Sequence, residues 1–183
     1  MTPLLRFEKV TLSRGGRQLF EDLDLSLGAG EALQVIGPNG SGKSSLIRLA
    51  AGLLKADRGK VERAPPALAD DNLALDRELP LGKALQFWGG DVGRAIEALG
   101  LEDLSAVPVR LLSSGQAKRA MLARAIASGS RLWLLDEPLN ALDTASAERL
   151  NDAVADHLGG GGAVLAASHQ PLGSGWRVME LGR

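Results

Sequence analysis

The stretch Val35–Leu54, VIGPNGSGKSSLIRLAAGLL, decides the fold class of this chain. It places Gly37, Gly40 and Gly42 in a polar loop that leads directly into an apolar run suited to a helix. Glycines in such a loop let several backbone N–H groups converge on one anion, and the helix N-terminus adds the positive end of its dipole. The stretch therefore predicts a phosphate-binding loop between a strand and a helix.

The spacing of residues within this stretch indicates which kind of phosphate-binding loop it is. Gly37, Gly42, Lys43 and Ser44 match the pattern G-x-x-x-x-G-K-[ST], so residues 37–44 are interpreted as a P-loop. We expect Lys43 to reach the β- and γ-phosphates of ATP, and the Ser44 hydroxyl to ligate Mg²⁺. A glycine-rich turn with an exposed lysine is the alternative, which the strand–loop–helix context disfavours. The expected ATP-binding residues are Gly37, Pro38, Asn39, Gly40, Ser41, Gly42, Lys43, Ser44 and Ser45.

Composition limits the other classes of function. With 183 residues, 45% of them hydrophobic, and a net charge of -1, the chain suits one globular domain without a broad basic surface for nucleic acid or anionic lipid. The absence of cysteine excludes disulfides and thiolate metal sites, and two histidines alone do not make a zinc site. No signal peptide or membrane-spanning run is present in the sequence, so we expect a cytoplasmic protein.

Short strand-type runs alternate with longer helix-type runs, which predicts an α/β fold. The runs 131–137, RLWLLDE, and 162–169, GAVLAASH, are apolar on consecutive residues, as central parallel strands are. The runs 5–12, LRFEKVTL, and 19–27, LFEDLDLSL, alternate apolar and polar residues, which favours an antiparallel flank. Further elements are expected as strands at 31–37 and 60–64 and helices beginning at Ser44, Leu81, Ser114 and Thr144.

Two carboxylates follow the apolar run 132–135. Asp136 and Glu137 would lie at the carboxyl end of a buried strand, the edge at which α/β sheets bind ligands. We expect Asp136 to hold Mg²⁺ and Glu137 to accept a proton from the water that attacks the γ-phosphate. Alternatively, both acids only end the strand in solvent, which the P-loop makes the weaker interpretation.

The segment Leu112–Gln116, LSSGQ, precedes the helical run GQAKRAMLARAIA. Taken alone, it is either a helix N-cap or a second anion site with hydroxyl and N–H donors. With this segment between the P-loop and the paired carboxylates, the chain resembles the ATP-binding cassette family, whose signature segment faces the γ-phosphate bound to the opposite subunit. The resemblance implies that two copies of the chain sandwich two ATP molecules. The signature residues it assigns are Ser113, Ser114, Gly115 and Gln116.

Further family motifs follow in the expected order. Asn140–Asp143, NALD, resembles the D-loop and places Asp143 in it, while His169 matches the switch histidine that contacts the γ-phosphate. Counting back from Glu78–Pro80, Asn72 is expected at the position of the Q-loop glutamine, with a shorter amide side chain.

The resemblance covers about residues 4–181. It implies that residues 1–183 form a single cassette, a P-loop NTPase fold with a parallel core sheet, an antiparallel flank and a helical subdomain over about 73–128. His157, in a helical run before four glycines, is expected to be an ordinary surface residue.

The adenine-binding region departs from the family pattern. The chain has no tyrosine, and the segment 11–20, TLSRGGRQLF, offers Arg14, Arg17 and Leu12 in place of the usual aromatic residue. A guanidinium group can stack on a base as a planar cation does on a π-system.

An apolar stripe follows the Q-loop position. Leu81, Leu85 and Trp88 recur at helical spacing, and Phe87 adds apolar surface. The stripe either packs inside the helical subdomain or accepts a helix of a membrane subunit.

Within the family, RGGRQLFEDLDLSL (14–27), LGKALQFW (81–88) and SHQPL (168–172) resemble the ATP-binding subunits of cytochrome c maturation exporters. That resemblance implies integral-membrane partner subunits, a role in haem export or delivery, and a peripheral position on the cytoplasmic face of the bacterial inner membrane. The alternatives are an exporter of another small solute or of lipid, a nucleotide sensor without hydrolysis, and a soluble cassette acting on the ribosome or nucleic acid. A single P-loop without a long insertion disfavours the last, so no nucleic-acid partner is expected.

Overall fold

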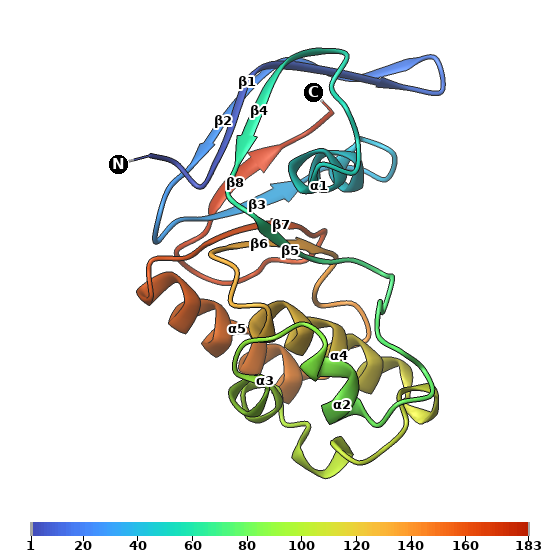
Figure 1. Cartoon of the computed structure of the whole chain (residues 1–183). Helices are drawn as coiled ribbons and strands as arrows, with labels where there is room; N and C mark the ends of the chain where they lie inside the picture. The colour runs from blue at the N-terminus through green and yellow to red at the C-terminus, as the bar shows by residue number, and fades with distance from the viewer. Residues whose placement is uncertain (1, 183) are drawn as a thin grey trace.

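The computed structural model describes residues 2–182, and Met1 and Arg183, the ends of the expected cassette, lie outside the described residues. Two β-sheets enclose one helix, and the remaining helices cover the outer face of the larger sheet (Figure 1). This arrangement confirms the predicted α/β class with a parallel core sheet and an antiparallel flank.

The smaller sheet is antiparallel. It consists of β1 (Leu5–Arg14), β2 (Arg17–Leu27) and β4 (Arg58–Arg63) in the order β2-β1-β4. The alternation at the start of β1 buries Leu5 and Phe7 against the interior and leaves Arg6, between them, at the surface.

The larger sheet is parallel, with strand order β5-β6-β7-β3-β8. The sequence predicts two of its strands, β6 and β7, from consecutive apolar residues. Their side chains are buried on both faces of the sheet, because both faces are covered. The edge strands β5 and β8 were not predicted, because PALA is very short and RVME is largely exposed. The strands are β3 (Ala32–Ile36), β5 (Pro66–Ala69), β6 (Leu132–Asp136), β7 (Ala163–Ala167) and β8 (Arg177–Glu180).

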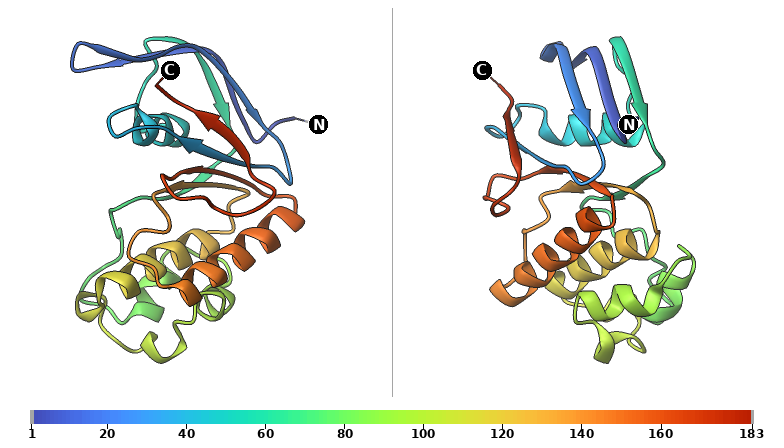
Figure 2. Two further views of the ribbon diagram at one scale, coloured as in Figure 1. Left: turned by 180° about the vertical axis from the view of Figure 1, so that it is seen from behind. Right: turned by 90° about the vertical axis from the view of Figure 1, so that its left-hand side faces the viewer.

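The helices lie in two layers. Helix α1 lies between the sheets, and α2 to α5 form the layer beneath the parallel sheet (Figure 2). The predicted starts are right to within one residue, whereas the short helix α3 was missed. The helices are α1 (Lys43–Ala51), α2 (Leu81–Gln86), α3 (Val92–Ala98), α4 (Ser114–Ala127) and α5 (Thr144–Gly159), with 3-10 turns at Glu102–Leu104 and Val109–Leu111.

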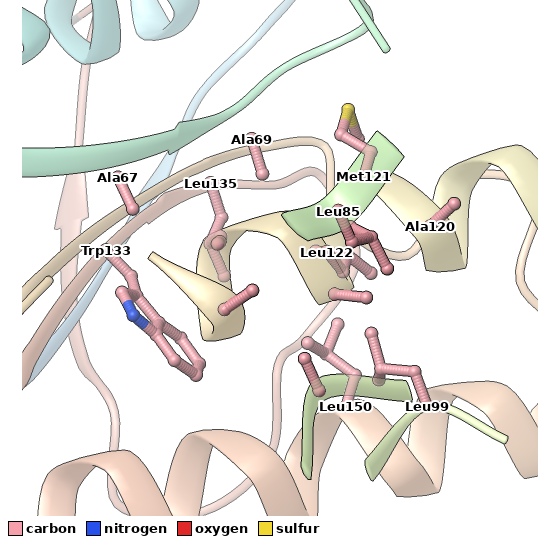
Figure 3. Close-up of a cluster of buried hydrophobic side chains, with 14 of the residues drawn as sticks. Ala67, Ala69, Leu85, Leu99, Ala120, Met121, Leu122, Trp133, Leu135 and Leu150 are labelled. Carbon is pink, nitrogen blue, oxygen red and sulfur yellow. The ribbon is translucent and has the colours of Figure 1, made fainter. Parts of the chain in front are cut away.

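Each layer has its own apolar core. One core joins α1 to both sheets, and the other fills the space between the parallel sheet and α2 to α5. In the second core, Trp133 and Leu135 of β6 project from the sheet into a cluster that also contains Leu122 of α4, with Leu99 and Leu150 below (Figure 3).

The expectation that His157 is an ordinary surface residue is wrong. Its ring stacks on Trp133, with the ring centroids 3.8 Å apart and the planes inclined by 12°. Gly162 leaves room for this ring, since a Cβ at that position would lie 2.2 Å from the imidazole. Burial lowers the pKa of His157, because the charged imidazolium loses hydration there.

The apolar stripe is divided between core and surface. Leu81 and Leu85 are fully buried, whereas the Phe87 side chain is 85% exposed. The Trp88 ring is partly buried beneath the guanidinium of Arg124, whose Cζ lies 4.6 Å from the ring centroid. Among residues 2–182, no helix is long and apolar enough to cross a membrane.

Candidate active site

The P-loop connects β3 to α1. Gly42, the N-cap of α1, has φ of 105°, and Gly37 has φ of 148°, values that L side chains rarely adopt. A Cβ on Gly37 would lie 2.4 Å from the carbonyl oxygen of Leu181, just beyond β8. Glycine is therefore required at position 37 by both conformation and space.

Two polar side chains of the P-loop, those of Ser41 and Lys43, are buried. Lys43 is buried, and its Nζ donates to the carbonyl oxygens of Gly37, at 2.8 Å, and Pro38, at 3.3 Å. The Ser41 hydroxyl is buried without a hydrogen-bond partner among the residues described. A buried unpartnered hydroxyl beside an ammonium group fits a loop that receives an anionic ligand.

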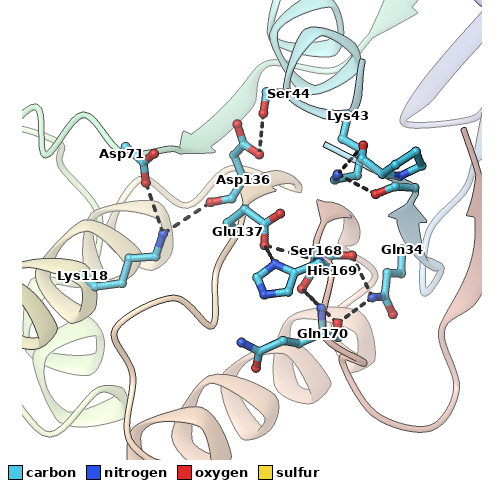
Figure 4. Close-up of polar contacts among 12 residues, drawn as sticks. Gln34, Lys43, Ser44, Asp71, Lys118, Asp136, Glu137, Ser168, His169 and Gln170 are labelled. Atoms are coloured by element: carbon cyan, nitrogen blue, oxygen red, sulfur yellow. Dashed lines mark hydrogen bonds and ion pairs between the residues drawn. The ribbon is translucent and has the colours of Figure 1, made fainter. Parts of the chain in front are cut away.

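The two residues expected to hold a metal lie together. Ser44 Oγ donates to Asp136 Oδ1 at 3.1 Å, joining the first turn of α1 to the end of β6 (Figure 4). Burial raises the pKa of Asp136, and the Ser44 hydrogen bond acts in the opposite direction. Hydroxyl and carboxylate oxygens are ligands that suit Mg²⁺.

Glu137 and His169 form a side-chain pair at the same sheet edge. The Glu137 backbone has φ of 46°, a strained conformation for a residue with a side chain, and its N–H donates to Ala167 O at 2.8 Å. Its Oε2 lies 2.8 Å from Nδ1 of His169, which is about half exposed (Figure 4). The strained backbone turns this carboxylate toward the end of β7.

Asp71 and Asn72, neighbours at the expected Q-loop position, make different contacts. Asn72 turns back and donates to Asp70 from its backbone N–H, at 3.0 Å, and from Nδ2, at 3.2 Å. The exposed Asp71 lies 3.9 Å from the buried Lys118 ammonium, which also donates to Asp136 O at 3.3 Å. Burial lowers the pKa of Lys118. Counting along the sequence could not decide between these neighbouring positions.

The signature segment caps α4. Ser113 Oγ accepts from the Gln116 N–H at 3.3 Å, and Gln116 Oε1 accepts from the Ser113 N–H at 2.9 Å. Ser113 and Ser114 are exposed at the start of the helix. Gly115 lies against the next motif, since a Cβ there would be 2.9 Å from Ala141 O.

Asp143 caps α5 and accepts from the Ser146 N–H at 2.8 Å. Hydrogen bonds from Ser146 lower the pKa of Asp143. The D-loop therefore ends in a fixed helix start beside the signature segment.

A cavity of about 530 Å³ opens over the P-loop. Arg14, Leu19 and Glu137 line it together with P-loop residues, whereas Leu12 is buried in the core. Of the three residues expected near adenine, only Arg14 lines this cavity. No signature residue is among the described residues that line it, so the two motifs of one chain face different spaces.

Comparison with known proteins identifies this constellation. The family model described as ABC transporter matches residues 20–140. This chain belongs to the ABC transporter family. It is an ATP-binding subunit similar to CcmA: it is 52% identical over 180 residues to the cytochrome c biogenesis ATP-binding export protein CcmA of Sphingopyxis alaskensis, covering 94% of this chain and 93% of that protein.

Further comparisons agree. The subunit is 54% identical over 166 residues to the CcmA protein of Novosphingobium aromaticivorans, covering 89% of this chain and 87% of that one. The solved structure of an ATP-binding subunit of an ABC transporter shares the fold, with a TM-score of 0.82, 21% identity and coverage of 91% of this chain and 79% of that chain.

Family membership fixes the general activity. The subunit binds nucleotide and hydrolyses ATP, and ABC transporter ATPases of this kind dimerise and work with membrane partner subunits.

Three residues near the site were missed from the sequence: Gln34, Asp71 and Lys118. The signal for Gln34 was an amide within the apolar strand ALQVI, since a buried amide needs hydrogen-bond partners. Nothing in the local sequence distinguished Asp71 and Lys118 from surface charges.

Proposed function

We propose that this subunit powers a cytochrome c maturation exporter by closing on ATP as a dimer and reopening after hydrolysis. The observation that carries the proposal is the convergence of Ser44, Asp136, Glu137 and His169 at one sheet edge beside the P-loop. The transport system is inferred from the names of the relatives, and the ATP hydrolysis chemistry is inferred from the residues of the site.

In this proposal the P-loop binds the phosphates of ATP. Residues 37–45 surround them with backbone N–H groups, and Lys43 exchanges its carbonyl partners for β- and γ-phosphate oxygens. The orphaned Ser41 hydroxyl gains a partner in the bound state. Ser44 and Asp136 would hold Mg²⁺, which neutralises phosphate charge when bound.

Glu137 acts as the general base. It takes a proton from the attacking water, and its contact with His169 Nδ1 holds the carboxylate in position. His169 is proposed to contact the γ-phosphate through its exposed ring. The strain at Glu137 fits this role, because strained backbone is concentrated at functional sites.

The second copy of the chain completes each site. Ser113, Ser114, Gly115 and Gln116 would approach the γ-phosphate bound to the partner subunit, and Asp143 fixes the D-loop between the two sites. The exposure of the signature serines and their separation from the P-loop cavity of the same chain support this assignment. Residues 1–183 would then act as one cassette, with about 73–128 as its helical subdomain.

The cargo step is assigned to the cytochrome c biogenesis system, serving haem export or delivery, with integral-membrane subunits binding the cassette at the cytoplasmic face of the inner membrane. The second candidate is an exporter of another small solute or of lipid, because the hydrolytic site is the same for any cargo. The names of the relatives favour the first.

Complementation tests the proposal. This chain is expressed in a bacterium whose CcmA has been deleted but whose membrane subunits are intact, and covalently bound haem in c-type cytochromes is measured. We expect the wild-type chain to restore the cytochromes and Glu137→Gln to leave them absent at equal protein level. Normal ATP hydrolysis without restoration would instead assign the chain to another exporter.

A further inference from the structure

A glutamine lies inside the central apolar strand that leads into the P-loop. Gln34 occupies the middle of β3, ALQVI, and is 4% exposed between β7 and β8. An amide in such a place is costly unless its donors and acceptor are used, and an apolar side chain of similar size would fill the space without that cost. The hydrogen bonds of Gln34 therefore need an explanation.

All of these bonds go to one loop, residues 168–172, which follows β7. Gln34 Nε2 donates to Ser168 O at 3.3 Å and to Gln170 O at 2.7 Å (Figure 4). Its Oε1 accepts from the Leu172 N–H at 3.3 Å. One side chain thus binds the backbone on both sides of His169.

The loop has no rigid secondary structure of its own to hold it. Ser168 extends the β7 ladder through one bond to Val35 O, at 3.2 Å, and its hydroxyl bonds to Gln170 at 2.9 and 3.1 Å. His169 itself projects from this turn, with its ring half exposed and its Nδ1 on Glu137. The attachment of the turn to β3 therefore depends largely on the Gln34 amide.

We propose that Gln34 is a positioning residue for hydrolysis, one that holds His169 against Glu137 and in fixed relation to the phosphates. The inference rests on the proposed role of His169. Because β3 continues from Gln34 into Gly37 within three residues, the same strand sets both the phosphate cradle and the histidine turn. A displacement of about 1 Å at a reacting group can cost 10²-fold in rate, so this link affects chemistry more than binding.

The test uses the full-length chain and single-turnover hydrolysis of γ-labelled ATP with enzyme in excess. Gln34→Leu fills the same space without donors, and we expect the single-turnover rate at saturating enzyme to fall by about 10- to 100-fold. The dissociation constant for ATP should stay within about twofold, since no phosphate contact is changed. Leu33→Val, a buried change on the neighbouring position of β3, is the matched control and should leave the rate per folded protein unchanged.

A double variant separates positioning from general stabilisation. In a His169→Ala background, Gln34→Leu should lower the rate by no more than about a further twofold. The effects of two substitutions are not additive when one residue acts through the other. If Gln34→Leu does not fold, Gln34→Met repeats the test, since its unbranched side chain keeps about the length of glutamine and removes the donors.

The outcomes are distinct. A wild-type rate in Gln34→Leu, or a full multiplicative loss in the double variant, overturns the inference while leaving the role of His169 intact. A wild-type rate in His169→Ala refutes the proposed function of that histidine, and the inference with it.

Discussion

His169 Nδ1 and Glu137 Oε2 lie 2.8 Å apart although 32 positions separate the two residues in the sequence. The contact exists because β6 and β7 are adjacent parallel strands whose carboxyl ends meet at one edge. It places an imidazole directly on the carboxylate that is proposed to activate water, so a change to either residue should affect hydrolysis before it affects nucleotide affinity.

Glu137→Gln keeps the shape of the side chain and removes its basicity. We expect hydrolysis to slow by about 10²–10⁴-fold with ATP affinity nearly unchanged, and an ATP-bound dimer to accumulate in size-exclusion chromatography. Lys43→Ala is the control, because it should weaken ATP binding by removing the cation from the phosphates. Comparable hydrolysis by Glu137→Gln and the wild type would eliminate Glu137 as the base.

Two defective chains should restore each other if each site is shared. Lys43→Ala damages the P-loop side, and Gly115→Asp adds a carboxylate to the signature side, so each homodimer has no working site. Their mixed dimer combines both defects at one site and leaves the other intact. We expect measurable hydrolysis when the two variants are mixed. For the wild-type protein, we expect the hydrolysis rate per subunit to fall on dilution. Inactivity of the mixture at every ratio would argue for sites built within one chain.

Asp71 should matter more than Asn72. Asp71→Ala removes the carboxylate facing Lys118, whereas the Asn72 side chain hydrogen-bonds to Asp70 of its own turn. Groups that support a metal site typically contribute about 10- to 100-fold to activity, so we expect a loss of this size in Asp71→Ala and less than about twofold in Asn72→Ala. ATPase assays over a Mg²⁺ titration measure both, and the reverse ranking would support Asn72 in the Q-loop role.

Phe87 and Trp88 should separate partner binding from stability. Phe87→Ala alters an exposed ring and should change the free energy of unfolding by less than about 0.5 kcal/mol, whereas Trp88→Ala loses packing against Arg124 and should cost up to about 3 kcal/mol. If the exposed part of the stripe contacts a membrane subunit, Phe87→Ala lowers stimulated ATPase more than basal ATPase. Urea unfolding and co-purification with the membrane subunits distinguish the two effects, and full stimulation of Phe87→Ala would remove it from the interface.

His157 should make stability depend on pH. Its pKa is lowered in the folded state from the usual 6.5, so the unfolded chain binds more protons and the free energy of unfolding rises with pH in that range. Stability from the neutral ring is therefore present above about pH 6.5 and is lost as the pH falls from there toward the folded pKa. His157→Gln should show a smaller fall in melting temperature between pH 7.5 and 5.5, and equal falls in both proteins would contradict the assignment.

The parts of the site that the sequence predicts are those whose chemistry lies in one contiguous segment. The P-loop, the pair Asp136–Glu137 and the signature segment each combine a spacing with a helix or strand boundary, and the structure has those boundaries at the expected residues to within one position. Their proposed roles still await the experiments above.

The parts that were missed depend on contacts between distant segments. Trp133 of β6 stacks on His157 of α5, and Gln34 hydrogen-bonds to a loop more than 130 residues away. The strands β5 and β8 form because neighbours in the sheet supply hydrogen bonds, which neither short sequence specifies alone. Local pattern cannot report such tertiary effects.

The strand order β7-β3-β8 also sets when the nucleotide site can form during synthesis. The P-loop strand is made early, yet its two partners, β7 and β8, follow it by more than 120 residues, and a carbonyl just past β8 lies against Gly37. Chains emerge from the ribosome N-terminus first, so neither edge of β3 can be paired until β7 and β8 have been made. Until then it presents unpaired strand edges, and ATP can begin to stabilise the fold only once the last strand is in place.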